Sequence, residues 1–268
     1  MALITEKIGR IKSPIKWAGG KTQLLSQIKP LYPKRFNLYL EPFVGGGAVF
    51  FDLQPDNALL LDSNFELINF YQVVKDNPSE LLKDLEGHRN EKDYYYEVRS
   101  LDPTQMGSIE RASRFLFMNK TCFNGLWRVN KKGKFNVPFG RYKKPNFWDR
   151  ENLYMVSVAL QNTEVICSDF SSVMEYATPG SFVYLDPPYH PLSETSNFTS
   201  YTKDSFGKEE QRPVKELKLR LYGMNWEFEI MLSPRAVKNL KALDHSNQKR
   251  VKNAIHKLAQ FPPTWWER

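Results

Sequence analysis

Short apolar runs alternate with stretches of helical periodicity along most of this chain. Each run is followed within two residues by a carboxylic acid, and the runs lie at residues 38–40, 58–61, 165–167 and 182–185. Runs of this length bounded by turn residues are typical of buried strands. Helical spacing of apolar residues marks the intervening stretches, at residues 24–28, from 48, 67–71 and 78–118. This alternation predicts an α/β fold with a mainly parallel sheet and helices on both of its faces.

Two segments depart from this alternation. Residues 1–15 read as a loose arm, and residues 119–147 are predicted to be irregular, basic and rich in aromatic side chains. From residue 212 the pattern changes again. A linker is predicted over 212–223, and residues 224–268 read as a strand followed by two helices. Ser233-Pro234 is a strong start for the first of these helices, with serine as the cap and proline at the first position.

Composition narrows the class of protein. No apolar run is long enough to span a bilayer, the N-terminus lacks the apolar core of a signal peptide, and the two cysteines show no metal-type spacing. We therefore expect a cytoplasmic protein with no membrane partner, no disulfide framework and no bound metal.

Positive charge is concentrated in one part of the chain. Residues 111–150 carry a net charge of +10, whereas the rest of the first 211 residues is acidic overall. A basic block on an acidic body is typical of a surface that binds a polyanion, and nucleic acid is the favoured partner. A solvated charged loop is the alternative.

Two motifs follow predicted strands. Phe43-Val44-Gly45-Gly46-Gly47 lies between a strand and a helix, where glycines let the backbone approach a ligand closely. Asp62 ends the next strand, where it could accept hydrogen bonds from a ribose. The spacing is not that of a dinucleotide fingerprint, so a nucleoside-bearing cofactor of another type is favoured.

The tetrapeptide Asp186-Pro187-Pro188-Tyr189 stops the last predicted strand. Its prolines stiffen the turn at the carboxyl end of that strand, where open α/β sheets place their ligands. An acceptor beside a flat aromatic face suits an amino group attached to a planar ring. A proline-stopped strand with a capping aspartate is the structural alternative.

These motifs belong to an ordered set of six sequence blocks. The set is Lys16-Trp17-Ala18-Gly19-Gly20-Lys21, Glu41 to Gly47, Asn119 with Phe123 to Arg128, Phe135 to Pro145, Asp186 to Tyr189, and Asn197 to Tyr201. In this order the blocks closely resemble a Dam-type DNA adenine N6-methyltransferase over residues 8–211. The resemblance implies a Rossmann-like methyltransferase sheet with a helical and loop insertion for DNA recognition at about 75–150.

The resemblance also implies a cofactor, S-adenosylmethionine. The residues that would bind it are Trp17, Ala18, Lys21, Phe43, Gly45, Gly47, Asp62, Asp169 and Phe170. Alternatives stay open for four of them. Trp17 and Phe170 could be core aromatics, Asp62 could be a turn aspartate, and Lys21 could contact DNA or be a solvated lysine.

For catalysis, the resemblance implies that the target adenine is flipped out of the duplex. Tyr189 would stack on the adenine, while Asp186 and the Pro187 carbonyl would accept hydrogen bonds from N6. Direct transfer of the methyl group would follow.

The implied partner is double-stranded DNA carrying the sequence GATC, bound by a monomer. Base-reading and neighbouring residues would be Lys16, Asn124, Leu126, Arg128, Pro138 and Arg141. Arginine is suited to bidentate contact with guanine, and the lysines at 131, 132, 134, 143 and 144 to phosphates. A loop that binds any polyanion is the alternative.

Past residue 211 the resemblance ends, and residues 224–265 resemble the N-terminal half of a RelE/ParE-type toxin. We therefore expect a methyltransferase domain that is truncated at its C-terminal end and carries a short β-α-α appendage. An inactive remnant that still binds cofactor or DNA is one alternative function, and a toxin-related binding module is another.

Overall fold

The computed structural model describes residues 9–143 and 145–187, and its centre is a four-stranded parallel sheet. The strands are β1 (Leu38–Glu41), β2 (Ala58–Asp62), β3 (Thr163–Cys167) and β4 (Ser181–Val183), in the order β3-β2-β1-β4. Every pairing between neighbours is parallel. The predicted α/β class and parallel sheet are confirmed.

Side chains alternate between the two faces of the sheet, as the two-residue period of a strand requires. Tyr39 and Leu60 join the larger hydrophobic cluster, whereas Leu40, Leu59 and Leu61 join a second cluster on the opposite face. All five are almost completely buried. Because both faces are covered, the strands read as continuous apolar runs, which is typical of a parallel sheet.

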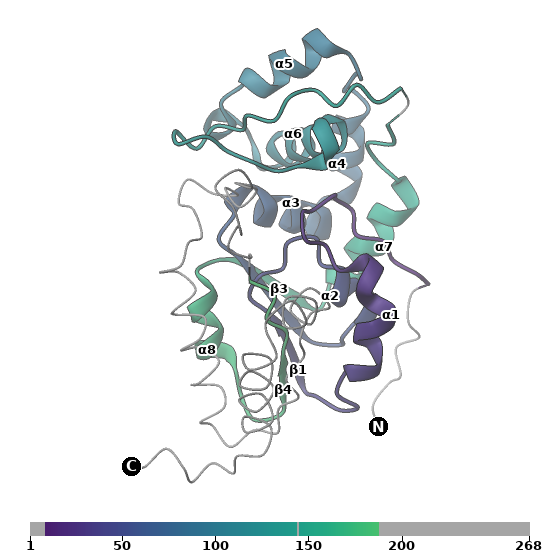
Figure 1. Cartoon of the computed structure of the whole chain (residues 1–268), viewed down its shortest axis with the longest axis vertical. Coiled ribbons are helices and arrows are strands. Elements are labelled where there is room, and N and C mark those ends of the chain that lie inside the picture. Colours follow the sequence, from purple (N-terminus) through teal and green to yellow (C-terminus); the bar gives the residue numbers. More distant parts are fainter. Residues whose placement is uncertain (1–8, 144, 188–268) are drawn as a thin grey trace, which may run out of the picture.

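Helices cover both faces of the sheet (Figure 1). The larger cluster takes in α1 (Leu25–Ile28), α2 (Ala48–Leu53), α3 (Phe65–Asp76) and α7 (Arg150–Leu160). The second cluster takes in η5 (Phe170–Ser172) and α8 (Val173–Tyr176). The prediction of helices on both faces is therefore confirmed.

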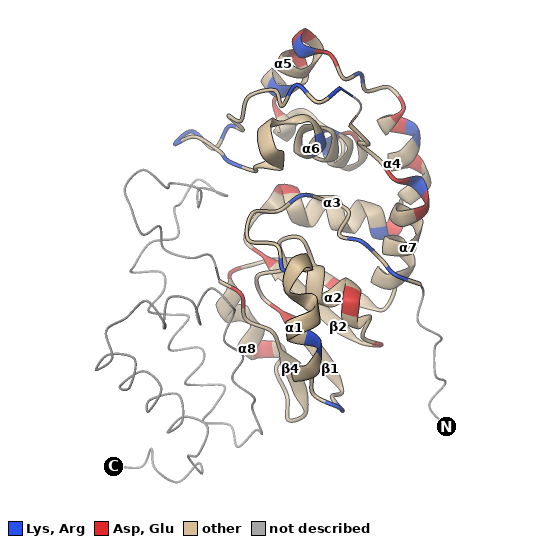
Figure 2. Cartoon of the chain, turned by 45° about the vertical axis from the view of Figure 1, so that its right-hand side comes forward, with Lys and Arg blue, Asp and Glu red and all other residues tan. Residues whose placement is uncertain are grey.

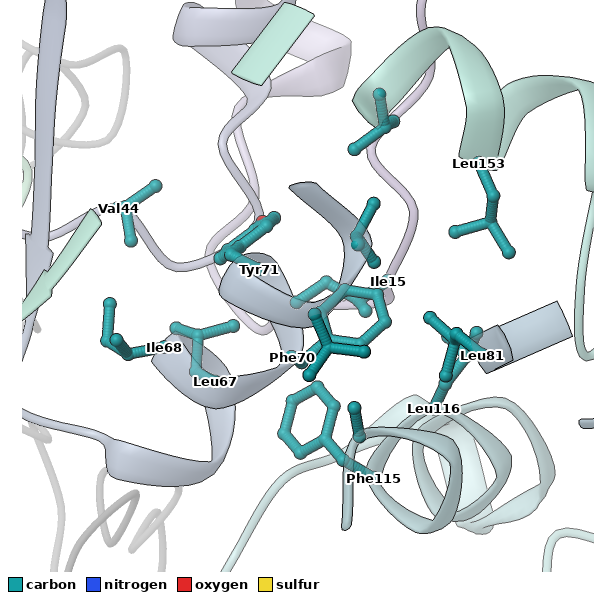
Figure 3. Packing of buried hydrophobic residues seen from close by; sticks show 14 of the residues in the cluster. Ile15, Val44, Leu67, Ile68, Phe70, Tyr71, Leu81, Phe115, Leu116 and Leu153 are labelled. Carbon is teal, nitrogen blue, oxygen red and sulfur yellow. The ribbon is translucent and has the colours of Figure 1, made fainter. Parts of the chain in front are cut away.

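A helical layer packs on the side of α3 that faces away from the sheet (Figure 1). It contains α4 (Pro78–Leu85), α5 (Lys92–Ser100), η3 (Pro103–Gln105) and α6 (Ser108–Thr121). Phe70 of α3 meets Phe115 of α6 with ring centroids 5.4 Å apart, and Leu81 of α4 lies beside Leu116 of α6 (Figure 3). These contacts join the helical layer to the sheet domain through one continuous core.

Residues 122–143 and 145–149 pass over this layer, and in these described residues there is no α-helix and no strand longer than a single bridge. They contain the turn η4 (Phe123–Gly125) and two isolated antiparallel bridges, Cys122 with Phe139 and Val129 with Phe135. Aromatic contacts fix the segment, since Trp127 lies 4.3 Å from Phe115 between ring centroids. The predicted irregular region is confirmed, except that α6 continues through Thr121.

Two local predictions are corrected. The stretch after Lys21 is not one helix: η1 (Thr22–Leu24), α1 and η2 (Lys29–Leu31) follow one another, and Pro30 lies in the last of them. The strand predicted at 182–185 is shorter than expected and only half-buried. Among the described residues it is an edge strand of the sheet, paired with β1 alone.

The predicted linker at 212–223, the toxin-like segment and the question of truncation lie outside the described residues. So do Pro188, Tyr189 and the block from Asn197 to Tyr201.

The contact between α3 and α6 generates a stability prediction. Phe70 is fully buried, so Phe70→Ala is expected to lower the free energy of unfolding by about 3–5 kcal/mol, through lost burial and the cavity left behind. Urea denaturation followed by circular dichroism measures the change. Phe65→Ala, on the same helix but 52% exposed, is the matched control and should cost less than about 1 kcal/mol, including its contact with Arg111. Equal losses in the two variants would contradict the packing described here.

Candidate active site

The carboxyl ends of the four parallel strands bring the predicted site residues to one edge of the sheet (Figure 1). The Phe43–Gly47 loop follows β1, Asp62 ends β2, Asp169 follows β3 and Asp186 follows β4. Strand order reverses at β1, because β2 and β3 lie on one side of it and β4 on the other. Open α/β sheets bind their ligands at such a reversal.

The glycine loop has a backbone that side chains would not tolerate. Gly45 and Gly47 have φ values of +45° and +63°. A Cβ on Gly45 would lie 2.6 Å from the Trp17 ring, and one on Gly47 would lie 2.7 Å from Phe51. The hydroxyl of Tyr71 donates to the Gly45 carbonyl over 2.9 Å. The loop is therefore held by the Tyr71 hydroxyl and packed tightly against the indole ring of Trp17.

Asp62 lies beside this loop and is tied to it. Its carboxylate accepts hydrogen bonds from the backbone N–H of Gly45 at 3.3 Å and of Asn64 at 2.9 Å. Burial raises the pKa of Asp62 to about 6, against the lowering effect of these backbone donors. The turn role considered from sequence is thus present, and the same carboxylate adjoins the glycine loop that a nucleoside would approach.

Asp186 forms an ion pair with Lys21, whose ammonium also donates to the Gly19 carbonyl over 2.8 Å. Lys21 is only 6% exposed, so its interpretation as a solvated lysine is wrong. A buried charge of this kind needs a partner, and Asp186 supplies it. The pair joins the residue before η1 to the turn that follows β4 and fixes the position of the carboxylate. Pro187, the next residue, is half-buried.

Glu41, at the end of β1, adds a second carboxyl group near this pair. It is buried and accepts a hydrogen bond of 2.8 Å from the Tyr39 hydroxyl. Burial raises the pKa of Glu41 well above its ordinary value, and the Asp186 carboxylate adds to that rise. The sequence placed Glu41 in a motif without giving it a role, since its burial is visible only in the fold.

Asp169 and Phe170 have local partners. The Asp169 carboxylate is exposed and accepts hydrogen bonds from the N–H and hydroxyl of Ser171, capping η5. Phe170 is 9% exposed and stacks on Phe43 with ring centroids 5.1 Å apart. Phe170 is therefore part of the second core cluster, as the structural alternative allowed. A cofactor role for either residue stays a prediction.

Two buried asparagines hold the N-terminal arm in place. Asn119 of α6 accepts from the Lys16 N–H at 2.8 Å and donates to the Lys16 carbonyl at 2.7 Å. Asn152 of α7 makes the same pair of bonds to Lys12, each of 2.9 Å. Each amide replaces the backbone partner that an irregular segment lacks. Trp17 and Ala18, which follow Lys16, are both half-buried, and the Trp17 side chain lies against Gly45.

Within the irregular basic segment, residues 129–135 form a short hairpin-like turn beside α6. Figure 2 marks the Lys and Arg residues of this segment in blue. Asn130 closes the turn by accepting from the backbone N–H of Lys132 and Lys134. At its base, the Arg128 guanidinium donates to the Asn136 side chain over 2.8 Å. Arg128 is half-buried, so this bond orients a side chain that is already restricted.

The other predicted DNA-binding residues lie on or near this segment. Asn124 is exposed with a φ of +56°, Leu126 is half-buried and Pro138 is exposed. Arg141 is exposed and also has a φ of +56°. Exposed side chains on a rigidly anchored loop suit contact with a ligand.

Sequence reasoning gave no role to Glu41, Asn119, Asn136 or Asn152, although the first three lie inside the blocks that carry the resemblance. For Asn119 and Asn152 the partners are distant along the chain, up to 140 residues for Asn152, whereas Glu41 and Asn136 bond to residues near them in sequence. Only their presence beside known motifs could have marked them.

Two further properties concern residues 9–143 and 145–187. Every helix there is too short or too polar to cross a lipid bilayer. Within the same residues, histidine, cysteine and carboxylate side chains form no group that could hold a metal ion.

Comparison with known proteins identifies relatives over most of the chain. The type II methyltransferase M1.LlaDCHI of Lactococcus lactis subsp. cremoris is 48% identical over 209 residues, which cover 75% of this chain and 74% of the relative. The type II methyltransferase M.MjaIII of Methanocaldococcus jannaschii is 46% identical over 222 residues, or 75% and 77% of the two chains. The DNA adenine methylase of Serratia marcescens is 40% identical over 207 residues, or 76% of each.

The match to a protein family covers more of the chain than the motifs do. Residues 17–256 match the D12 class N6 adenine-specific DNA methyltransferase family. This match passes residue 211, where the sequence blocks end, and includes much of the segment that resembles a toxin. The comparisons therefore give the toxin resemblance no support, and it stays a prediction.

The glycine loop, Asp62 and Asp186 meet at the strand-order reversal, and a family match spans most of the residues that hold them there. Relatives named as type II and adenine DNA methyltransferases share 40–48% of the aligned residues. This chain belongs to the D12 class N6 adenine-specific DNA methyltransferase family.

Proposed function

We propose that this protein transfers a methyl group from S-adenosylmethionine to adenine N6 within GATC in duplex DNA. The observation that carries the proposal is the placement of Asp186 and the glycine loop at the same edge of the sheet, at the reversal of strand order, with Asp186 held by its ion pair to Lys21. An acceptor for an amino group then lies at the same edge of the sheet as a glycine loop suited to a nucleoside.

The residues at this edge fit the cofactor. Positive φ values at Gly45 and Gly47 keep side chains off the loop, so its backbone can approach a ligand. The Asp62 carboxylate can accept from ribose hydroxyls, and Trp17, Ala18 and Phe43 supply apolar surface nearby. When bound, S-adenosylmethionine supplies a methyl group on a positively charged sulfur.

At the target base, Asp186 accepts a hydrogen bond from the N6 amino group, and the Pro187 carbonyl accepts another. These two acceptors orient the N6 lone pair, and such positioning accounts for a large share of a rate enhancement. The base must leave the duplex to reach them. We propose that Tyr189 stacks on the flipped base, a role that lies outside the described residues.

Recognition of the duplex falls to the basic segment and the arm. Arg128, oriented by Asn136, reads a guanine, and Lys16, Asn124, Leu126 and Pro138 contact further bases. Arg141 and the segment's lysines bind phosphates, which add affinity without sequence information. The net charge of +10 over residues 111–150 supports this division of roles.

We further propose that the protein acts as a monomer and that it acts in the cytoplasm, at the nucleoid, where its DNA substrate lies. Size-exclusion chromatography with light scattering, run with and without duplex, tests the first point. A stable dimer in both runs would refute it.

Methyl transfer to the target base depends on Asp186. We expect Asp186→Asn, which keeps the shape but loses the charge that faces Lys21, to lower the rate at least about a hundredfold. The measurement is transfer of a labelled methyl group from S-adenosylmethionine to a GATC duplex. A duplex with the same bases in scrambled order is the substrate control. Full activity of the variant would exclude the proposed role of this carboxylate.

Asp62 is expected to make cofactor binding dependent on pH. Its pKa of about 6 leaves it mostly protonated at pH 5, whereas hydroxyl donors from a ribose favour the ionised form. Binding of S-adenosylhomocysteine, measured by calorimetry, should therefore strengthen about tenfold between pH 5 and pH 7. Asp62→Asn should bind more weakly and without this slope. An unchanged slope in the variant would assign the titration to another group, such as Glu41.

The same pKa makes a prediction for folding without ligand. A carboxyl group whose folded pKa lies above its unfolded value stabilises the fold most at low pH, and that contribution is lost as pH rises through about 6. Asp62→Asn should remove this loss, so the thermal unfolding temperatures of the two proteins should diverge between about pH 4 and pH 6 and stay apart by a constant amount above pH 6. Parallel profiles from pH 4 to pH 8 would contradict it.

Arg128 is expected to determine specificity rather than general affinity. Arg128→Ala should cost about 1–3 kcal/mol of discrimination between GATC and a duplex in which one guanine pair is replaced. Lys132→Ala, at the exposed turn, is the matched control. It should weaken binding to all duplexes alike and reduce the slope of log affinity against log salt by about 1. Equal losses of discrimination in the two variants would refute the division of roles.

A further inference from the structure

Lys16, before the glycine loop, packs against the turn η4 of the segment proposed to read DNA. The proposed roles in cofactor binding and DNA reading do not explain the contacts between them. Lys16 belongs to the arm that continues into Trp17 and Ala18 over the glycine loop. The turn η4 belongs to the segment that carries Asn124, Leu126 and Arg128. The two segments are more than 100 residues apart in sequence, and both contact the side chain of Asn119, near the end of α6.

Asn119 is fully buried and uses its side-chain amide on both segments. It accepts from the Lys16 N–H at 2.8 Å and donates to the Lys16 carbonyl at 2.7 Å. The same amide nitrogen lies 3.5 Å from the Gly125 carbonyl in the turn. One side chain therefore sets where Lys16 lies relative to the turn.

Gly125 completes the contact from the other side. Its φ is +62°, and a Cβ there would lie 2.3 Å from Cδ and 2.5 Å from Cβ of Lys16. The lysine stem thus lies against bare backbone. Its ammonium lies 4.3 Å from the centre of the Tyr142 ring, and the Tyr142 carbonyl accepts from Asn90 over 2.7 Å. Backbone, stem and ammonium of Lys16 are each held by a different element.

The arm also reaches the cofactor side. Trp17 directly follows Lys16, and its ring lies 2.6 Å from the position that a Cβ on Gly45 would take. A shift of Lys16 therefore moves both a proposed base-reading side chain and the residue that covers the glycine loop.

We propose that Asn119 is a positioning residue that registers the cofactor-covering arm against the DNA-reading turn, so that sequence discrimination depends on it. This inference rests on the proposed function, because it assigns Asn119 a task within DNA recognition. Asn119 touches neither substrate and acts through Lys16 and Gly125.

The chain offers a matched control for this proposal. Asn152 is also buried and makes the same pair of hydrogen bonds to the arm, at Lys12. Its backbone N–H bonds to Asp149 within its own helix cap. Asn152→Ala therefore loosens the arm by the same chemistry without breaking the contact between Lys16 and the turn.

The test compares wild-type protein with Asn119→Ala, Gly125→Ala and Asn152→Ala. Fluorescence anisotropy measures Kd for a GATC duplex and for four duplexes, each with one base pair replaced. Steady-state kinetics give kcat and KM for the duplex and for S-adenosylmethionine. Thermal unfolding shows whether each variant is folded.

For Asn119→Ala and Gly125→Ala, KM and Kd for the GATC duplex should rise about tenfold or more, and discrimination among the duplexes should fall by a similar factor. For Asn152→Ala, KM for S-adenosylmethionine should rise, while discrimination stays at the wild-type value. A purely structural role would lower the active fraction, which reduces kcat and leaves both KM values unchanged.

Three results would overturn the inference: a fall in kcat alone in Asn119→Ala, an equal loss of discrimination in Asn152→Ala, or wild-type discrimination in Gly125→Ala. If Asn119→Ala does not fold, Gly125→Ala decides, because it disturbs the same junction from the turn. Wild-type protein that binds GATC selectively without methyl transfer would refute the proposed activity, and the Kd ratios would still test the role of Asn119.

Discussion

The parallel pairing of β1 with β2 on one side and β4 on the other is the constraint on which the site depends. Parallel strands end on the same edge, and the residues that follow them are therefore brought together whatever their distance along the chain. Asp62 and Asp186 are 124 positions apart in the sequence, and both lie at this edge. Although β4 has only three residues, the Tyr184 N–H donates to the Leu40 carbonyl and so continues the pairing toward Asp186.

Side-chain amides hold the irregular parts of the chain where strands and helices cannot. A buried backbone group needs a hydrogen-bond partner, and a segment without regular structure must find one elsewhere. Asn119 and Asn152 supply it for the arm, Asn130 closes the turn of the basic segment, and Asn136 orients Arg128. These polar contacts add to the apolar anchoring of the loops proposed to contact DNA and cofactor, which bury Ile15, Val44 and Trp127 in the larger core cluster.

Burying the charged groups at the sheet edge costs solvation free energy, and neighbouring residues offset that cost. Removing a carboxylate or an ammonium from water is unfavourable unless it is paired and hydrogen-bonded. Lys21 pairs with Asp186 and also donates to Gly19, and Glu41 receives the Tyr39 hydroxyl. An active site built this way has its acceptors placed before any ligand arrives, so less reorganisation is needed when a base amino group binds.

The amino-acid pattern by itself determined the class of fold, the four strands of the described sheet and most helices around them. Strands buried on both faces are continuous apolar runs, and the helices that cover them have apolar residues at helical spacing. It also determined the family, since the motif blocks are ordered and specific, and it located the glycine loop, Asp62, Asp186 and Arg128. The burial of Lys21, the raised pKa of Glu41 and the tasks of Asn119, Asn136 and Asn152 were decided only by the tertiary structure. Most of these depend on a contact between segments distant in sequence, and Asn136 bonds to Arg128 across an irregular turn. Neither kind of contact leaves a periodicity in the chain. The position of Phe170 could not be predicted for the same reason. It stacks on Phe43 in the second core cluster because the sheet brings the ends of β1 and β3 to one edge, and the residues next to Phe170 in sequence do not reveal this.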